Sequence, residues 1–106
     1  MRYIGRIQDD KLLKAEDRVI IYGCGGTGKK VYEELKKQGL SSKVCAFCDG
    51  DLKQVGKQIE NIPVLSVREA AETYREAAFL VASCCVKDMV TELQRNHVDN
   101  IHITRA

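Results

Sequence analysis

The chain has 106 residues, a length typical of one domain with one hydrophobic core. Hydrophobic residues make up 44% and charged residues 30%, which excludes collagenous, low-complexity and disordered proteins, and no apolar run reaches the ~18–20 residues that span a bilayer. The formal net charge of +2 lacks the strongly basic character typical of nucleic-acid binding, so no nucleic-acid partner is expected.

A strand, a glycine-rich turn and a helix are predicted in the first part of the chain. Residues 1–17 are mixed and charged and form a lead-in segment. Residues 18–22 are a continuous apolar run rich in β-branched side chains, which predicts a strand covered on both faces. After a turn at residues 23–28, residues 27–38 repeat apolar side chains at helical spacing, and Gly39 supplies the stop.

The rest of the chain alternates strands and helices in the same way. Ser66 followed by Glu69 forms a capping box, which predicts the start of a helix. The remaining elements are, in chain order, a strand at residues 44–48, a loop at residues 50–65 with two short extended pieces, a helix at residues 66–75, a strand at residues 78–82, a helix at residues 86–93 and a strand at residues 101–103.

This alternation predicts an α/β fold. Crossovers between parallel strands are right-handed, so we expect three layers, with a mostly parallel sheet of about four to five strands and helices on both faces. The domain is expected to cover residues 18–106, after the lead-in at residues 1–17.

The turn after the first strand carries the sequence Gly-Cys-Gly-Gly-Thr-Gly, which matches G-x-G-x-x-G between a predicted strand and a predicted helix. In such a turn the first glycine allows the bend, the second lets the backbone approach a phosphate, and the third permits close helix–strand packing. The helix N-terminus offers free N–H groups to the anion. The expected phosphate-binding residues are therefore Gly23, Gly25, Gly26, Thr27 and Gly28.

Asp49 ends the second predicted strand, about 20 residues after the last glycine of the turn. An acid at this place typically accepts hydrogen bonds from the ribose hydroxyls of an adenosine. Its carboxylate would repel a phosphate at the 2′ position, so an unphosphorylated ribose is favoured. The turn and Asp49 together predict that NAD or another adenine nucleotide is the cofactor.

Two other nucleotide-type motifs fit the same turn less well. The phosphate-binding loop G-x-x-x-x-G-K-[ST] fails at its last position, where Lys30 stands instead of a hydroxyl that would reach magnesium. A methyltransferase turn usually has an acid where Ile21 stands. Tyr32 and Lys36 have the spacing of a short-chain dehydrogenase pair, but on the first helix, and we interpret them as exposed side chains.

The cysteines and histidines suggest no metal site. The five cysteines are an odd number and give no even disulfide framework. Alternation along a strand places Cys45 and Cys48 on opposite faces, where they cannot share a metal ion. No role is predicted for Cys24 or for the Cys84–Cys85 pair.

The two histidines lack partners at ligand spacing, so His97 and His102 are expected at the surface. The N-terminal residues contain no apolar segment of signal-peptide length, and a cytoplasmic location with free thiols is expected.

Residues 19–25, Gly28, residues 47–51, Gly56 and residues 62–64 together resemble the small Rossmann-like nucleotide-binding domain of bacterial glycan-biosynthesis proteins. That domain precedes sugar acyltransferases, nucleotide-sugar dehydratases and epimerases, and some glycosyltransferases. The resemblance implies a nucleotide or nucleotide-sugar ligand, bound by the glycines of the turn and the acid that follows the next strand.

The length of the chain limits the mechanism. A full dinucleotide fold uses two halves and about six parallel strands, whereas about four are predicted here. No catalytic acid, base or nucleophile is placed by spacing. The first hypothesis is a binding module that is fused to, or works beside, a sugar-processing enzyme. The alternatives are a regulatory or interaction domain without its own ligand, able to form a homodimer, and a fragment of an NAD-dependent epimerase or dehydrogenase.

Overall fold

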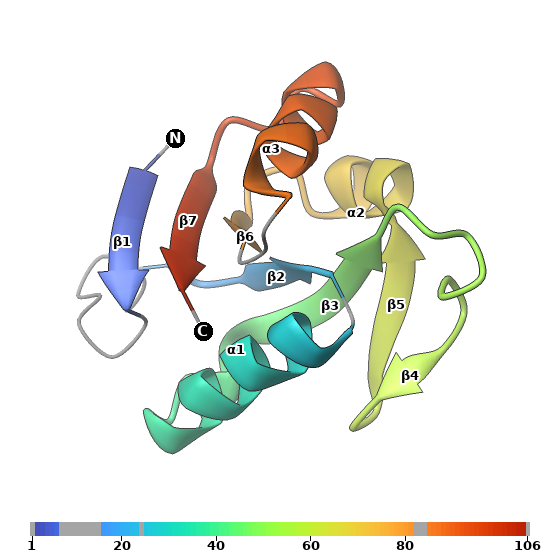
Figure 1. Cartoon of the computed structure of the whole chain (residues 1–106). Coiled ribbons are helices and arrows are strands. Elements are labelled where there is room, and N and C mark those ends of the chain that lie inside the picture. Colours follow the sequence, from blue (N-terminus) through green and yellow to red (C-terminus); the bar gives the residue numbers. More distant parts are fainter. Residues whose placement is uncertain (1, 7–15, 24, 82–84, 106) are drawn as a thin grey trace.

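The computed structural model describes residues 2–6, 16–23, 25–81 and 85–105, with the backbone alone for residues 2–6 and 105. Its centre is one twisted sheet with helices on both faces (Figure 1). In spatial order the strands are β1 (Arg2–Arg6), β7 (Ile101–Arg105), β6 (Ala78–Val81), β2 (Val19–Tyr22), β3 (Val44–Asp49), β5 (Ile62–Ser66) and β4 (Gln58–Ile59). All neighbours pair in parallel except β4, which is antiparallel to β5. The predicted α/β fold is confirmed, with more strands than expected.

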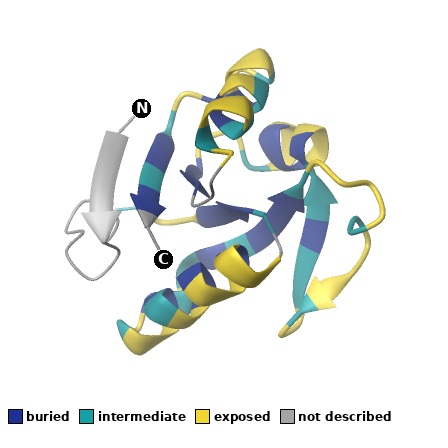
Figure 2. Cartoon of the chain, viewed as in Figure 1, coloured by how far each residue is buried: buried dark blue, intermediate teal, exposed yellow. Residues whose placement is uncertain are grey.

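Three α-helices cover the two faces of the sheet. Helix α1 (Gly26–Lys37) lies on one face, and α2 (Val67–Thr73) and α3 (Val86–Arg95) lie on the other; a 3-10 turn, η3 (Ser41–Lys43), precedes β3 (Figure 1). Because successive strand residues point to opposite faces, each strand supplies both layers of the core. Figure 2 shows the central strands as almost wholly buried.

Two apolar clusters fill the space between the layers. Ile21, Leu35 and Phe47 belong to the cluster under α1, while Ile20 and Leu93 belong to the cluster under α2 and α3. The neighbouring residues Ile20 and Ile21 are 0% and 1% exposed on opposite faces. This explains why strand β2 reads as a continuous apolar run rather than an alternating one.

The order of the strands reverses at β2. The chain runs outward from β2 to β3 and β5, then returns through α2 to β6, on the other side of β2. In open α/β sheets a ligand crevice forms at such a reversal, outside the carboxyl ends of the strands. The turn that follows β2 lies at this edge of the sheet.

The lead-in segment contributes a strand that the sequence analysis did not predict. Arg2 pairs with His102 and Arg6 pairs with Arg105, so β1 extends the sheet beyond β7. The strand is short, is flanked by arginines and finds its partner at the other end of the chain, and none of these features is a local signal. The division at residues 17 and 18 stays a prediction.

The predicted capping box is confirmed. Ser66 precedes α2, and its Oγ accepts a hydrogen bond of 3.1 Å from the backbone N–H of Glu69. Gly39 has φ +74°, a conformation that favours glycine, and follows the last turn of α1 as expected.

Candidate nucleotide-binding site

The turn after β2 has the geometry that the glycine spacing predicts. Gly23 has φ +100°, and its N–H donates a 2.7 Å hydrogen bond to the carbonyl oxygen of Cys48 on β3. A Cβ at Gly28 would lie 2.7 Å from the carbonyl carbon of Gly23 and collide with the carbonyl oxygen. Gly28 therefore lets α1 begin directly against the strand that precedes it.

The N-terminus of α1 faces open space. Gly25 is the N-cap residue, and no side chain of the described part of the chain caps the helix. A Cβ at Gly25 or at Gly26 would meet no atom within 4 Å. The first N–H groups of α1 are thus available to an external acceptor.

A pocket of about 230 Å³ opens at this helix N-terminus. Its lining includes all six residues predicted to bind the cofactor, together with one residue each from β2 and α3. These lining residues are Tyr22, Gly23, Gly25, Gly26, Thr27, Gly28, Asp49 and Met89. The fold therefore brings the glycine turn and the acid of β3 to one cavity, and their role in binding stays a prediction.

Backbone hydrogen bonds hold Asp49 at the pocket. It is the last residue of β3, and its Oδ1 accepts a 2.8 Å hydrogen bond from the N–H of Asp51. Oδ1 of Asp51 in turn accepts a 3.0 Å hydrogen bond from the N–H of Lys53. Two successive Asx turns shape the loop after β3. They give Asp51 a structural role in this loop.

A larger pocket of about 600 Å³ adjoins the first one and shares Tyr22, Asp49 and Met89 with it. Its other lining residues come from the loop after β3, the end of β5, α2 and α3; they are Gly50, Leu52, Ser66, Val67, Arg68, Asp88 and Glu92. Leu52 is 76% exposed at this pocket. The sequence analysis missed these residues because the spacing of α3 indicated only which side chains face the core.

Tyr22 lies in the lining of both pockets. Burial, the neighbouring thiol of Cys48 and the carboxylates of Glu92 and Asp49 raise the pKa of Tyr22 from 10.0 to about 12. The phenol therefore stays protonated at neutral pH and is a neutral hydrogen-bonding group.

This pKa shift predicts a loss of stability in alkali. The unfolded chain ionises Tyr22 near pH 10 and the folded chain near pH 12, so the stability linked to its protonated form is present below pH 10 and lost as the pH rises to 12. Urea unfolding at pH 9 and pH 11.5 should show a smaller decrease for Tyr22→Phe than for the unchanged protein. Equal decreases would contradict the assignment.

The placement of the cysteines corrects one prediction. Cys45 and Cys48 do not lie on opposite faces, because both pack against the cluster under α2 and α3. The strand register shifts between Val19 and Ile20, where β3 gains one residue, and this breaks the alternation. Burial raises the pKa of the Cys48 thiol, which is consistent with a packing role.

Of the three cysteines to which no role was assigned, the structure describes only Cys85. Cys24 and Cys84 lie outside the described residues, and Cys85 is exposed at the start of α3. Within the described part of the chain, no group of three or more His, Cys, Asp or Glu side chains is arranged to hold a metal ion.

The expected surface position of His102 is wrong, since the residue is 1% exposed. Its Nε2 lies 2.9 Å from Oδ1 of Asn100, and Nδ2 of Asn100 donates a 3.2 Å hydrogen bond to Glu16. The error arises because β1, which was not predicted, makes β7 an interior strand. His97 is exposed and has φ 63° just after α3.

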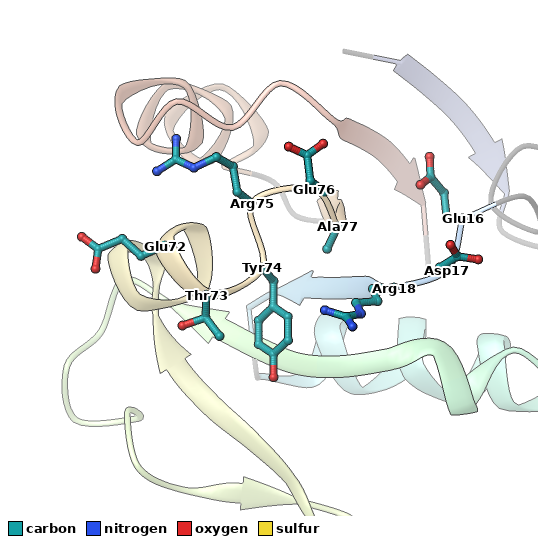
Figure 3. A pocket seen from close by; sticks show the side chains of 9 residues that line it. All are labelled: Glu16, Asp17, Arg18, Glu72, Thr73, Tyr74, Arg75, Glu76 and Ala77. Carbon is teal, nitrogen blue, oxygen red and sulfur yellow. The ribbon is translucent and has the colours of Figure 1, made fainter.

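A separate cavity of about 480 Å³ lies at the other end of the central strands, away from the glycine turn (Figure 3). Arg18 and Ala77, which directly precede β2 and β6, are among its lining residues, so the cavity lies at the amino ends of these strands. Ligand crevices of open α/β sheets lie at the carboxyl ends of the strands, so this cavity is not the candidate site.

In the described chain, no helix is both long and apolar enough to cross a membrane.

Solved structures of the same fold include Rex-family repressors. The chain resembles RSP, a Rex-family repressor, with TM-score 0.62 and 12% identity over 89% of this chain and 54% of that one. RSP in complex with β-NADH gives TM-score 0.61 and 12% identity, covering 86% of this chain and 53% of that one. The chain thus spans about half the length of these structures, and no curated protein matches it.

The exclusion of nucleic acid is corrected by a further similar structure. This is RSP in complex with β-NAD⁺ and operator DNA, with TM-score 0.61 and 12% identity, covering 86% of this chain and 51% of that one. A domain of this fold therefore occurs within a DNA-binding protein. The near-neutral charge of a single domain does not exclude a nucleic-acid partner, because another part of a longer protein can supply the basic surface.

The comparisons support only the more general part of the sequence resemblance. They show a Rossmann-like domain and no link to glycan biosynthesis. The family model described as CoA binding domain matches residues 14–105, nearly the whole chain. This chain therefore belongs to the CoA-binding domain family.

Proposed function

We propose that this domain binds an adenine dinucleotide with an unphosphorylated adenosine ribose, NAD, at the two adjoining pockets. The observation that carries the proposal is the single cavity that joins the uncapped N-terminus of α1 to the carboxylate of Asp49. A pyrophosphate and the ribose next to it need these two groups side by side.

The first part of the site suits a pyrophosphate. A phosphate group within the 230 Å³ pocket would accept hydrogen bonds from the first N–H groups of α1 and face the positive end of the helix dipole. The first turn of α1 contains no acidic residue, and Lys29 and Lys30 lie at its end. A bound anion would offset the unfavourable effect of these cations on the helix dipole.

The second part of the site distinguishes NAD from CoA. Both ligands contain an adenosine and a pyrophosphate, but the ribose of CoA carries a phosphate while that of NAD has free hydroxyls. The carboxylate of Asp49 accepts hydrogen bonds from ribose hydroxyls and repels a phosphate. Although the family is described as CoA-binding, the charge at this position favours NAD.

The adenine ring fits the larger pocket. This pocket continues from Asp49, and its lining includes apolar side chains from the loop after β3, from α2 and from α3, namely Leu52, Val67 and Met89. Burying such side chains against an aromatic base is favourable, at about 25 cal/mol for each Å² of apolar surface. The described RSP complexes contain β-NAD⁺ and β-NADH, which supports a dinucleotide ligand for this fold.

A nucleotide sugar is the second candidate, because it also combines a pyrophosphate with an unphosphorylated ribose. The two candidates differ in the base and in the group beyond the pyrophosphate. A direct comparison of ligands therefore separates them.

Calorimetric titration with NAD⁺, CoA and UDP-glucose tests the proposal. NAD⁺ should bind with the highest affinity, and Asp49→Ala should weaken it about tenfold, because hydrogen bonds from ribose to a charged acceptor are lost. The same variant should narrow the difference between NAD⁺ and CoA. Glu76→Ala, which also removes one negative charge but lies at the distant cavity, should leave both affinities unchanged.

Tighter binding of CoA than of NAD⁺ by the unchanged protein would contradict the assignment of Asp49. Tighter binding of UDP-glucose would favour the second candidate. An absence of binding for all three ligands would refute the proposed function.

A further inference from the structure

Tyr22 is a buried side chain whose hydroxyl has no hydrogen-bond partner within the part of the chain that the structure describes. The residue ends β2, is 6% exposed and packs in the apolar cluster under α2 and α3. Burying a polar group without a partner costs free energy, and buried hydroxyls in folded proteins are normally hydrogen-bonded. An unpartnered hydroxyl at this position therefore indicates a partner that comes from outside the chain.

The hydroxyl lies where the two pockets of the candidate site meet. Tyr22, Asp49 and Met89 are the described residues that line both pockets. A Cβ at Gly50 would lie 3.8 Å from Oη of Tyr22, so the hydroxyl is beside the residue that follows Asp49. Tyr22 contributes a neutral O–H donor at this junction, Asp49 a carboxylate that accepts, and Met89 apolar surface. A donor and an acceptor are thus placed together between the pockets.

The part of the ligand that reaches this junction is the adenosine ribose. The inference rests on the proposed function, which places the pyrophosphate in the smaller pocket and the base in the larger one, so that the sugar joining them passes between Tyr22 and Asp49. A ribose hydroxyl can donate one hydrogen bond and accept another at the same time. It can therefore donate to the carboxylate while it accepts from the phenol.

We propose that the Tyr22 hydroxyl donates a hydrogen bond to a hydroxyl of the adenosine ribose, so that the site selects ribonucleotides over deoxynucleotides. Tyr22 and Asp49 then bind the same sugar, one as donor and the other as acceptor. Phosphate oxygens and ring nitrogens of the base also accept hydrogen bonds, but the position of the phenol beside Gly50, at the end of β3, favours the sugar. A nucleotide whose sugar lacks both hydroxyls offers the phenol no such partner.

The test compares ADP, the adenosine diphosphate part of NAD, with 2′,3′-dideoxy-ADP, which lacks both ribose hydroxyls. In calorimetric titrations, Tyr22→Phe should weaken ADP binding about fivefold, because one neutral hydrogen bond is lost, and should not weaken binding of the dideoxy nucleotide. The free energy of unfolding at pH 7 should stay the same, because the deleted hydroxyl has no partner in the described chain.

Tyr32→Phe is the matched control. Tyr32 is 8% exposed, where the sequence analysis expected an exposed side chain, and it packs under α1 against Phe47. It belongs to the lining of neither pocket of the candidate site. This variant loses the same phenolic oxygen from a buried ring, and it should keep the affinities of the unchanged protein for both nucleotides.

The outcomes separate this inference from the proposed function. An equal loss of affinity for the two nucleotides in Tyr22→Phe would overturn the inference, because the phenol would then contact a phosphate or the base. Undiminished ADP binding by Tyr22→Phe would overturn it as well, and so would a large loss of stability, which would show that the hydroxyl is bonded within the protein.

NAD⁺ is titrated alongside the two nucleotides. Binding of NAD⁺ without binding of ADP would overturn the inference, because the adenosine ribose would then not anchor the ligand. If NAD⁺ does not bind, the proposed function fails and the inference fails with it.

Discussion

Replacing Gly25 by valine is expected to abolish nucleotide binding while leaving the fold intact. A Cβ at Gly25 meets no atom within 4 Å, and the residue has φ −77°, which any side chain tolerates. The valine side chain would instead extend into the 230 Å³ pocket and exclude a phosphate from the first N–H groups of α1. Loss of two charge-assisted hydrogen bonds weakens binding by at least about 100-fold.

Calorimetry with NAD⁺ and urea unfolding should be carried out on the same preparation. The free energy of unfolding should change by about 1 kcal/mol or less, because valine is a poorer N-cap residue than glycine. Loss of binding without loss of stability locates the phosphate at Gly25. Affinity equal to that of the unchanged protein would place the ligand elsewhere.

Replacing Gly28 by alanine is expected to lower the stability of the fold, in contrast to the Gly25 variant, which loses binding but not stability. The new Cβ would lie 2.7 Å from the carbonyl carbon of Gly23 and 3.7 Å from Cγ2 of Ile21. The atoms that the new Cβ meets are backbone atoms of Gly23, whose N–H donates a hydrogen bond to the carbonyl oxygen of Cys48. A shift of Gly23 that relieved the collision would strain this hydrogen bond between the turn and β3. Overpacking of this kind costs about 1–3 kcal/mol, and we expect the upper end of that range.

Gly26→Ala is the matched control, because its Cβ meets no atom within 4 Å at the first position of α1. Alanine favours a helix more than glycine does, so this variant should be as stable as the unchanged protein or slightly more stable. Similar urea midpoints for Gly28→Ala and Gly26→Ala would show that the turn does not need the close approach of α1.

The elements with strong local signals were predicted from the sequence to within a few residues. Burial on both faces gives the continuous apolar runs of β2, β3 and β6. Burial on one face gives the helical spacing of apolar residues in α1 and α3. Strand β1 was missed because its stability comes from pairing with β7, about a hundred residues away in the chain. The positions of Cys45 and His102 were wrong for related reasons, a register shift in β3 and the interior position of β7.

Some residues of the candidate site were likewise predicted from the sequence, and others were found only in the structure. Gly23, Gly28 and Asp49 follow from the order of strand, turn, helix and strand, and the structure brings them to one pocket. Glu92 could not be assigned to the adjoining pocket, since the helical pattern of α3 shows its buried side but not what its other side faces. Tyr22 was not assigned either, because it ends the apolar run of β2 and the pattern of that run indicates only burial.

The amino-acid sequence by itself determined the local geometry of this protein: a strand that ends in a tight glycine turn, a helix that starts there without a cap, and an acid at the end of the next strand. These features depend on backbone sterics between residues that are close in the chain. Only the tertiary structure decided that α3 stands beside the loop after β3 and forms the larger pocket. That placement depends on β6 returning to the far side of β2, a choice made by packing between distant segments.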